Sequence, residues 1–251
     1  MRVRSTDPLK ILNPASAGDA RHVVLSSYGG GLLGGDRVSL RLRVERGAML
    51  AVTTQSAGKA YRTDGPPCRQ AVEATVDDDA ILAVLPDPLC AFAGARFEQR
   101  QRYDLAAGGN LVWLDALTSG RHGRGERWAM DAIDSRTLVA VDGRPLLRET
   151  LALDAAAGPI GSPLRTGRFN CYAVLAMVGP RLGDLIAHAR TAVRGLELSP
   201  AAPLLAADAS LAGGAVFRVL GPDAQTTQHL LRDLLAPLAD LLGEAPWGRK
   251  W

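Results

Sequence analysis

The side chains that could act on a ligand stand in four short polar or glycine-rich segments, of which residues 28–36 are the first. Gly29, Gly31 and Gly34 have the GxGxxG spacing, and Asp36 follows them. In a dinucleotide-binding site a helix begins at these glycines, and its N-terminus holds the pyrophosphate. Here an alternating strand pattern follows, so no nucleotide site is predicted. A glycine-rich connection between strands is the simpler interpretation, but it leaves Asp36 unexplained.

Two further segments place single charged groups next to turn-forming residues. Residues 53–62 follow an apolar stretch with uncharged polar side chains and then Lys59, one of only three lysines in the chain. Residues 85–88 hold Asp87 between two prolines, which break a strand and fix a rigid turn. The plain interpretation is an exposed turn around Lys59 and a second turn capped by Asp87.

The fourth segment, residues 120–128, brings Arg121, His122 and Glu126 into one loop. A charged hairpin loop explains this composition. A loop that handles a ligand or binds a partner protein is the alternative, because three different ionisable groups converge there.

Established catalytic and metal-binding patterns are absent from the sequence. There is no GxSxG or HExxH motif, and the four histidines are dispersed. The three cysteines lack CxxC or zinc-ligand spacing, so neither a disulfide framework nor a structural zinc site is predicted. No group of carboxylates has calcium-loop spacing. Residue chemistry alone therefore indicates a β-rich protein that is not an enzyme.

Composition narrows the class of protein further. A hydrophobic fraction of 47% supports a sizeable core, and a net charge of +3 with few lysines does not match a nucleic-acid footprint. Residues 1–7 lack the apolar part of a signal peptide, and the longest uncharged apolar stretch, residues 169–180, is too short to span a bilayer. Scattered thiols suit a reducing compartment. We expect a cytoplasmic protein that binds neither nucleic acid nor membrane.

Strands are the elements that must position the four segments. Residues 38–44 alternate apolar and polar side chains, as a half-buried strand does. Residues 97–104 carry polar side chains on both faces, so this strand is either an edge or lines something wet.

A weak internal repeat runs through the same region. Leu50, Leu82 and Leu111 stand at equivalent points of three similar segments, 32 and then 29 residues apart. In each segment a strand ends, turns and enters an apolar strand. A period of about 30 residues indicates stacked β-layers, as in a solenoid. A run of ordinary hairpins in a sandwich fits the pattern equally well.

The last third of the chain has a different pattern. Short apolar strands are predicted at residues 172–178 and 215–220, and helices at residues 181–198 and 223–242. A loop rich in Ala, Gly and Pro, residues 154–166, precedes them. We expect a single domain, residues 1–251, in which the strand–helix–strand–helix region 167–251 packs on the β-rich repeat region 1–153.

Taken in order, these segments resemble the urease accessory protein family UreD, also called UreH. The resemblance rests on residues 29–37, 53–62, 85–88 with 92–96, and 113–115 leading to 120–121 and 125–126, and it covers nearly the whole chain. It implies a mainly β fold, a β-helix or solenoid of stacked sheets with two C-terminal α-helices. It therefore favours the solenoid over the sandwich. The motif turns are Gly29, Gly30, Gly31, Gly34, Gly35, Asp87, Gly120 and Arg121.

The resemblance also implies a role in urease maturation without turnover. A UreD-type protein binds the urease apoprotein and a UreF-like protein, which recruits a UreG-like GTPase that carries nickel. Nickel is thought to pass through a water-filled internal tunnel to the urease active site. The implied cofactors are therefore none tightly bound, with nickel as a transient cargo, and the implied assembly is a dimeric multi-protein complex.

Such a route needs weak and successive polar ligands, because Ni²⁺ is strongly hydrated and a tight site would trap it. A metallochaperone that holds nickel tightly is one alternative, and His122 close to Glu126 in space would favour it. An enzyme with an unrecognised site is another, and it needs a nucleophile and a base within hydrogen-bond reach. By motif we expect Lys59 to pair with a carboxylate in the tunnel wall. The residues expected on the route or at its mouths are Asp36, Lys59, Asp115, Glu126 and Glu149.

Overall fold

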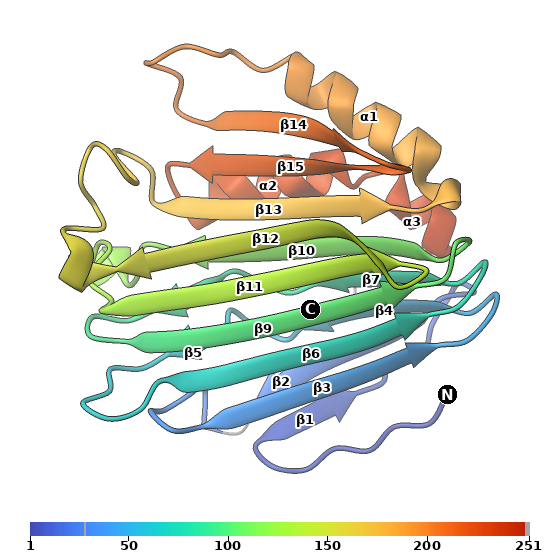
Figure 1. Ribbon diagram of the computed structural model, residues 1–251, viewed down its shortest axis with the longest axis horizontal. Helices are drawn as coiled ribbons and strands as arrows, with labels where there is room; N and C mark the ends of the chain where they lie inside the picture. Colours follow the sequence, from blue (N-terminus) through green and yellow to red (C-terminus); the bar gives the residue numbers. More distant parts are fainter. Residues whose placement is uncertain (28, 249–251) are drawn as a thin grey trace.

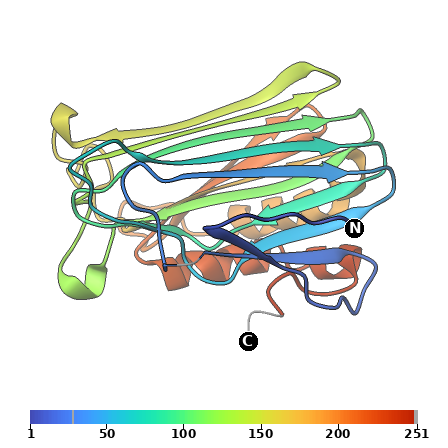
Figure 2. The same cartoon turned by 90° about the horizontal axis from the view of Figure 1, so that it is seen from below.

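The alternating and apolar stretches of the chain form strands in two stacked sheets (Figure 1). The computed structural model describes residues 1–27 and 29–248. Seen from below, the smaller sheet lies above the larger sheet, and helices cover the outer face of the larger sheet (Figure 2). The mainly β fold expected from the sequence is confirmed.

The larger sheet has ten strands and the smaller sheet has five. The smaller sheet runs in the order β12 (Arg144–Asp154), β11 (Ala132–Val141), β9 (Arg96–Leu105), β6 (Cys68–Val76) and β3 (Arg37–Val44). The larger sheet runs in the order β1 (Leu9–Leu12), β2 (Arg21–Ser27), β4 (Met49–Thr54), β7 (Ile81–Leu85), β10 (Asn110–Thr118), β13 (Cys171–Val178), β15 (Gly214–Gly221) and β14 (Leu205–Leu211). In addition, β8 (Leu89–Ala91) pairs with β10, and β5 (Lys59–Ala60) pairs with β8.

Four strands of each sheet run parallel and build the coils of a solenoid. β2, β4, β7 and β10 form one parallel run, and β3, β6, β9 and β11 form the other. Leu50, Leu82 and Leu111 are register neighbours in β4, β7 and β10, as the internal repeat predicts. The chain passes from the smaller sheet to the larger one and returns one strand further along. The stacked, solenoid-like arrangement is confirmed. Antiparallel pairing flanks the parallel runs, at β1 on one side and from β12 and β13 onwards on the other.

The C-terminal region departs from the predicted pattern in two places. An additional strand, β14, lies between the first helix and β15. The predicted second helix is divided at Pro237, which the sequence pattern of leucines did not reveal. The helices are α1 (Gly183–Arg194), α2 (Ala224–Leu234) and α3 (Leu238–Leu242), with 3-10 helices η1 (His122–Arg124), η2 (Ala155–Ala157) and η3 (Pro180–Leu182).

Three apolar clusters hold the layers together. One lies between the helices and the outer face of the larger sheet and contains Leu185, Leu234 and Phe217. The other two lie between the sheets, one around Trp113 and the other around Trp128. Burial of this apolar surface is the main stabilising contribution to the fold. In the part of the chain that the structure describes, no helix has the length and apolar character needed to cross a membrane.

Candidate functional site

A polar layer separates the two apolar clusters between the sheets. Along β9 the inward side chains change from Phe97 to Gln99 and Gln101 and back to Tyr103, and all four are buried. β10 has Asp115 between apolar neighbours that also face inwards. β9 lies between β6 and β11, so it is a central strand. Of the two alternatives for residues 97–104, the structure therefore selects the strand that lines a polar interior.

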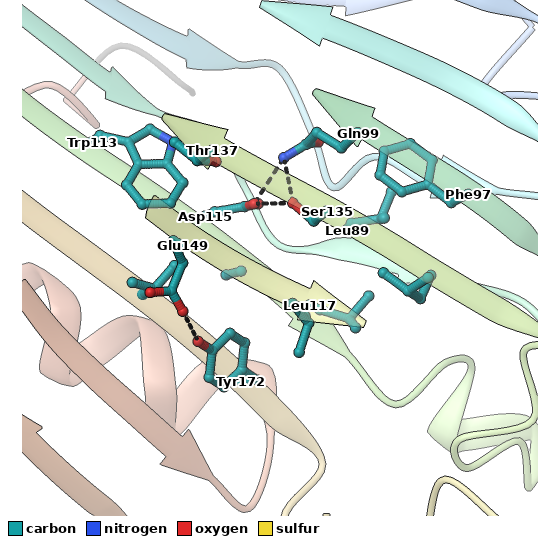
Figure 3. Close-up of a pocket in the computed structure, with 14 residues that line it drawn as sticks. Leu89, Phe97, Gln99, Trp113, Asp115, Leu117, Ser135, Thr137, Glu149 and Tyr172 are labelled. Atoms are coloured by element: carbon teal, nitrogen blue, oxygen red, sulfur yellow. Dashed lines mark hydrogen bonds between the residues drawn. The ribbon is translucent and has the colours of Figure 1, made fainter. Parts of the chain in front are cut away.

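The carboxylate of Asp115 lies at the centre of this layer (Figure 3). Its Oδ2 accepts hydrogen bonds from Gln99 Nε2 at 2.7 Å and from Ser135 Oγ at 3.2 Å. Gln101 Nε2 lies 3.3 Å from the same oxygen. Three strands, β9, β10 and β11, therefore position one carboxylate and its donors.

The donors around Asp115 are themselves held in place. Gln101 Oε1 accepts hydrogen bonds from the Tyr103 hydroxyl at 2.7 Å and from Trp113 Nε1 at 3.2 Å. These two bonds fix which end of the Gln101 amide faces Asp115, because its oxygen is already engaged. The layer is a preorganised network rather than a loose collection of polar groups.

Burial raises the pKa of Asp115 to about 6. The hydrogen bonds from Ser135 and Gln99 oppose this shift because they stabilise the ionised form, and the nearby charge of Glu149 adds to it. The carboxylate is therefore largely ionised at neutral pH. Among the described residues, no basic side chain forms an ion pair with it. A buried carboxylate of this kind favours a cation in the adjoining space.

Glu149 on β12 forms the second acidic position of the layer. Its carboxylate accepts a hydrogen bond from the Tyr172 hydroxyl at 3.1 Å and pairs with Arg218 of β15. The Glu149 side chain is 10% exposed, whereas that of Arg218 is 45% exposed. The polar layer thus reaches the surface at Arg218, between β12 and β15.

Three cavities follow one another between the sheets. The first, of about 20 Å³, is lined by Glu149, Tyr172 and Asp115 and has room for about one water molecule. The second, of about 80 Å³, shares Asp115 and Gln99 with the first. The third, of about 400 Å³, shares Thr54 with the second and ends at Lys59. Polar side chains therefore line a series of cavities from Glu149, past Asp115, to Lys59, which we call the route.

Asp87 lies where this route approaches the helical side of the molecule. It lines both the cavity of about 80 Å³ and an outer cleft of about 520 Å³. Its carboxylate accepts hydrogen bonds from Thr54 Oγ1 at 3.0 Å and from Gln228 Nε2 of α2 at 3.4 Å. Asp87 was expected only to cap a turn, and in the structure it also separates the inner cavity from the outer cleft.

The residues expected on the route divide into two groups. Asp115 and Glu149 lie on it, and Lys59 lies at its wide end. Asp36 and Glu126 do not line any of the three cavities in the described structure. Lys59 forms no ion pair with the residues that the structure describes, so the carboxylate partner expected of it is not found there.

Asp36 and Glu126 instead stabilise loops that lead into strands of the smaller sheet, β3 and β11. Asp36 Oδ2 accepts a hydrogen bond from the Leu33 N–H at 2.8 Å and so closes its own turn. Glu126 pairs with Arg121 and accepts a hydrogen bond from the Ala93 N–H at 3.3 Å. Arg121 also lies over the Phe92 ring, with its guanidinium carbon 4.2 Å from the ring centroid. The geometry of these two carboxylates is that of loop supports.

The glycine-rich segment packs against the wide end of the route. A Cβ at Gly31 would lie 2.6 Å from the Tyr61 ring and 2.8 Å from the Lys59 carbonyl oxygen, so only glycine fits there. Gly35 has a φ of +86°, which favours glycine as well. After these glycines the chain enters β3, so the absence of a following helix is confirmed.

Sequence reasoning did not single out several members of the layer. They are uncharged, or they come from β13, β15 and α2, which lie far from the motifs in sequence. A signal was available in part, because a polar side chain at an inward position of an otherwise apolar strand marks a polar interior. The residues missed are Ser135, Thr137, Tyr172, Arg218 and Gln228, whereas Gln99 and Gln101 lie in the strand 97–104 that was expected to be an edge or to line something wet.

Within residues 1–27 and 29–248, no three His, Cys, Asp or Glu side chains gather as a metal-binding group. His122 is exposed on η1, and Glu126 is engaged by Arg121. The arrangement that would favour a tight nickel site, His122 together with Glu126, is therefore not found in this region.

Comparison with known proteins places the chain in a family. The family model described as UreD urease accessory protein matches residues 1–251. The chain belongs to the UreD family. The urease accessory protein UreD of Sorangium cellulosum is 43% identical over 97% of this chain and 77% of its own length. Urease accessory protein D of Arabidopsis thaliana is 32% identical over 96% of this chain and 92% of its own length.

Membership of the UreD family supports a role in urease maturation. Relatives with this description occur in bacteria and in plants, and the UreD of Anaeromyxobacter sp. is 39% identical over 98% of this chain and 82% of its own length. The polar layer and its cavities are thus features of a maturation factor.

Proposed function

We propose that this chain is a non-enzymatic, cytoplasmic scaffold that binds the urease apoprotein and UreF-like and UreG-like partners and passes nickel between them. Nickel would travel between the sheets as cargo, without a tightly bound resting place. The observation that supports this most directly is the series of three cavities joined at Asp115 and Thr54. A dimeric assembly of these proteins is part of the proposal.

The size of each cavity determines how much of its hydration water a nickel ion could keep there. A hydrated Ni²⁺ fits the cavity of about 400 Å³ but not one of about 20 Å³, which holds about one water molecule. At the narrow part the ion would exchange water for oxygen atoms of Asp115, Ser135 and Glu149. Hard oxygen ligands bind Ni²⁺ weakly compared with nitrogen and sulfur ligands, so the ion can leave again.

The absence of turnover fits the chemistry of the layer. Asp115, Gln99 and Ser135 form hydrogen bonds that use their donors and acceptors on one another. The Ser135 hydroxyl lies 3.2 Å from the Asp115 carboxylate, but the narrow cavity beside them leaves no room for an organic substrate. The layer can coordinate and release a small cation.

The experiment compares urease activation by the wild-type chain with activation by Asp115→Asn and Glu149→Gln, together with apo-urease and its UreF and UreG proteins. Nickel content and urea hydrolysis are measured, and co-purification tests assembly. Both variants are expected to assemble and to deliver less nickel. Asp208→Asn is the matched control, because Asp208 of β14 pairs with Arg190 of α1 and lines none of the three cavities in the described structure.

Omission of the chain tests the wider role. Nickel content and urea hydrolysis should both collapse when the chain is left out. Full activation without it would refute a role in maturation of that urease. Full activation by both variants, with the chain still required, would refute the route but leave the scaffold.

A further inference from the structure

The smaller sheet ends at an open strand, β3, while the larger sheet continues past the matching strand, β2, through β1. In the described part of the chain β3 pairs only with β6. The hydrogen bonds from Arg69 N–H to Asp36 O and from Asp77 N–H to Val44 O direct the even-numbered residues of β3 towards β6. The backbone groups that point to the open edge therefore belong to Arg37, Ser39, Arg41 and Arg43.

The inner face of β3 is incompletely covered. Val38 and Leu42 are half-buried, whereas the inward residues Val72 and Ala74 of the neighbouring β6 are buried. The cavity of about 400 Å³ begins at this end, where Val38 and Leu9 of β1 line it. The last coil of a solenoid needs a cap, because no further coil covers its apolar face. At this end the larger sheet supplies one more strand, β1, and the smaller sheet supplies none.

The outer face of β3 has a one-sided charge. It carries Arg37, Arg41 and Arg43 and no carboxylate. Arg41 pairs with Glu73 of β6 at 3.0 Å, and no ion pair joins Arg37 or Arg43 to a residue that the structure describes. A further strand would lie beside these arginines on the other side, as β6 lies beside Arg41. Carboxylates on that strand would form cross-strand ion pairs with these arginines.

We propose that a partner protein adds an extended segment to the open edge of β3. Its side chains alternate, with apolar residues facing inwards onto Val38 and Leu42 and Asp or Glu facing outwards towards Arg37, Arg41 and Arg43. Main-chain hydrogen bonds to the edge provide affinity, and the alternating side chains provide specificity. The inference rests on the proposed function, since it requires a partner, and it names the surface and the chemistry of one contact.

Other occupants of the edge fit the charge less well. A second copy paired through β3 would place arginines against arginines, which is unfavourable in a sheet. The N-terminal segment of the same chain carries Arg2 and Arg4 and is also basic. Arginines on an open edge also discourage indiscriminate pairing of strands. If the arginines only prevent strand pairing, the edge of β3 stays open in the assembled complex. If an acidic strand binds, the edge is covered there.

The first test is amide hydrogen exchange of β3 in the isolated chain and in the complex with apo-urease and its UreF and UreG proteins. In the isolated chain Ser39, Arg41 and Arg43 should exchange quickly, and Leu40 and Leu42 should be protected by β6. Assembly should slow exchange at the three edge amides at least tenfold. Unchanged exchange at these amides in an assembled complex would overturn the inference.

Two variants separate the backbone from the charge. Ser39→Pro removes an N–H that points to the open edge and leaves the hydrogen bonds to β6 in place, as proline permits on an edge. Arg37→Glu with Arg43→Glu reverses the charge of the edge. Each should weaken assembly at least tenfold. Arg148→Glu is the control, because Arg148 lies on the same outer face but on β12, the opposite edge strand.

The outcomes also distinguish this inference from the function on which it rests. If the wild-type chain does not assemble with the three proteins, its role as their scaffold is refuted, and the strand contact is refuted with it. If assembly is normal for the wild-type chain and for the doubly reversed variant, the scaffold stands and the acidic strand is refuted. Weakening by the doubly reversed variant but not by Arg148→Glu supports it, even if Ser39→Pro fails to fold.

Discussion

Asp115→Asn should make the protein more stable at neutral pH. The pKa of this carboxyl is about 6 in the folded protein, against a usual value of 3.8. The folded state therefore binds the proton more tightly than the unfolded state does. The stability that the Asp115 carboxyl contributes is greatest below its unfolded pKa and is lost as the pH rises through about 6. Asparagine resembles the protonated form, so it should not suffer this loss.

The size of the effect follows from the shift. A difference of about 2 pKa units corresponds to about 3 kcal/mol at pH 7, since one unit is worth about 1.4 kcal/mol. This figure is an upper estimate, because Asp115 faces a cavity with room for water, which screens the charge. Near pH 4 the wild-type chain and the variant should differ little.

Urea unfolding followed by tryptophan fluorescence at several pH values measures this difference. The stability gap between Asp115→Asn and the wild-type chain should open between pH 5 and pH 7. Asp208→Asn should show no gain at pH 7, because it removes the ion pair with Arg190. If Asp115→Asn is less stable than the wild-type chain at pH 7, the hydrogen bonds to the ionised carboxylate outweigh the cost of its burial, and the reasoning is wrong.

Three further predictions concern the frame of the route. Leu82→Ala should lower the free energy of unfolding by about 2–5 kcal/mol in urea titration, because Leu82 is fully buried between its register neighbours. Gly31→Ala should lower the thermal midpoint, because the new Cβ would lie 2.8 Å from a backbone oxygen; an unchanged midpoint would mean that the turn moves freely. Arg218→Ala should lower the free energy of unfolding in urea titration, since it leaves the Glu149 carboxylate buried without its cation.

The sequence alone was sufficient to predict the parts of the fold that repeat. Three leucines at a spacing of about 30 residues predicted strands that turn out to be register neighbours, because a repeated side-chain pattern is satisfied by stacking equivalent positions. The break at Pro237 and the strand β14 were not predicted. A helix pattern of leucines continues across that proline, and β14 is rich in alanine, which does not favour strands.

The candidate site was predicted in part. Asp115 and Glu149 were expected from the family resemblance, and both line the narrow cavity between the sheets. Asp36 and Glu126 belong to equally recognisable motifs, yet their nearest partners are their own loops. Local sequence cannot tell these cases apart, because the distinction depends on whether the opposite sheet supplies polar groups such as Tyr172.

The parallel register also determines which ion the interior could admit. On β9 the residues next to the inward glutamines are Glu98, Arg100 and Arg102, all of which point outwards. A slip of one residue in this strand would exchange the two faces. Arg100 and Arg102 would then replace the amides around Asp115 and neutralise it, and the same coil would repel cations. The negative charge of the interior therefore depends on the alignment of a strand as much as on any single acidic residue.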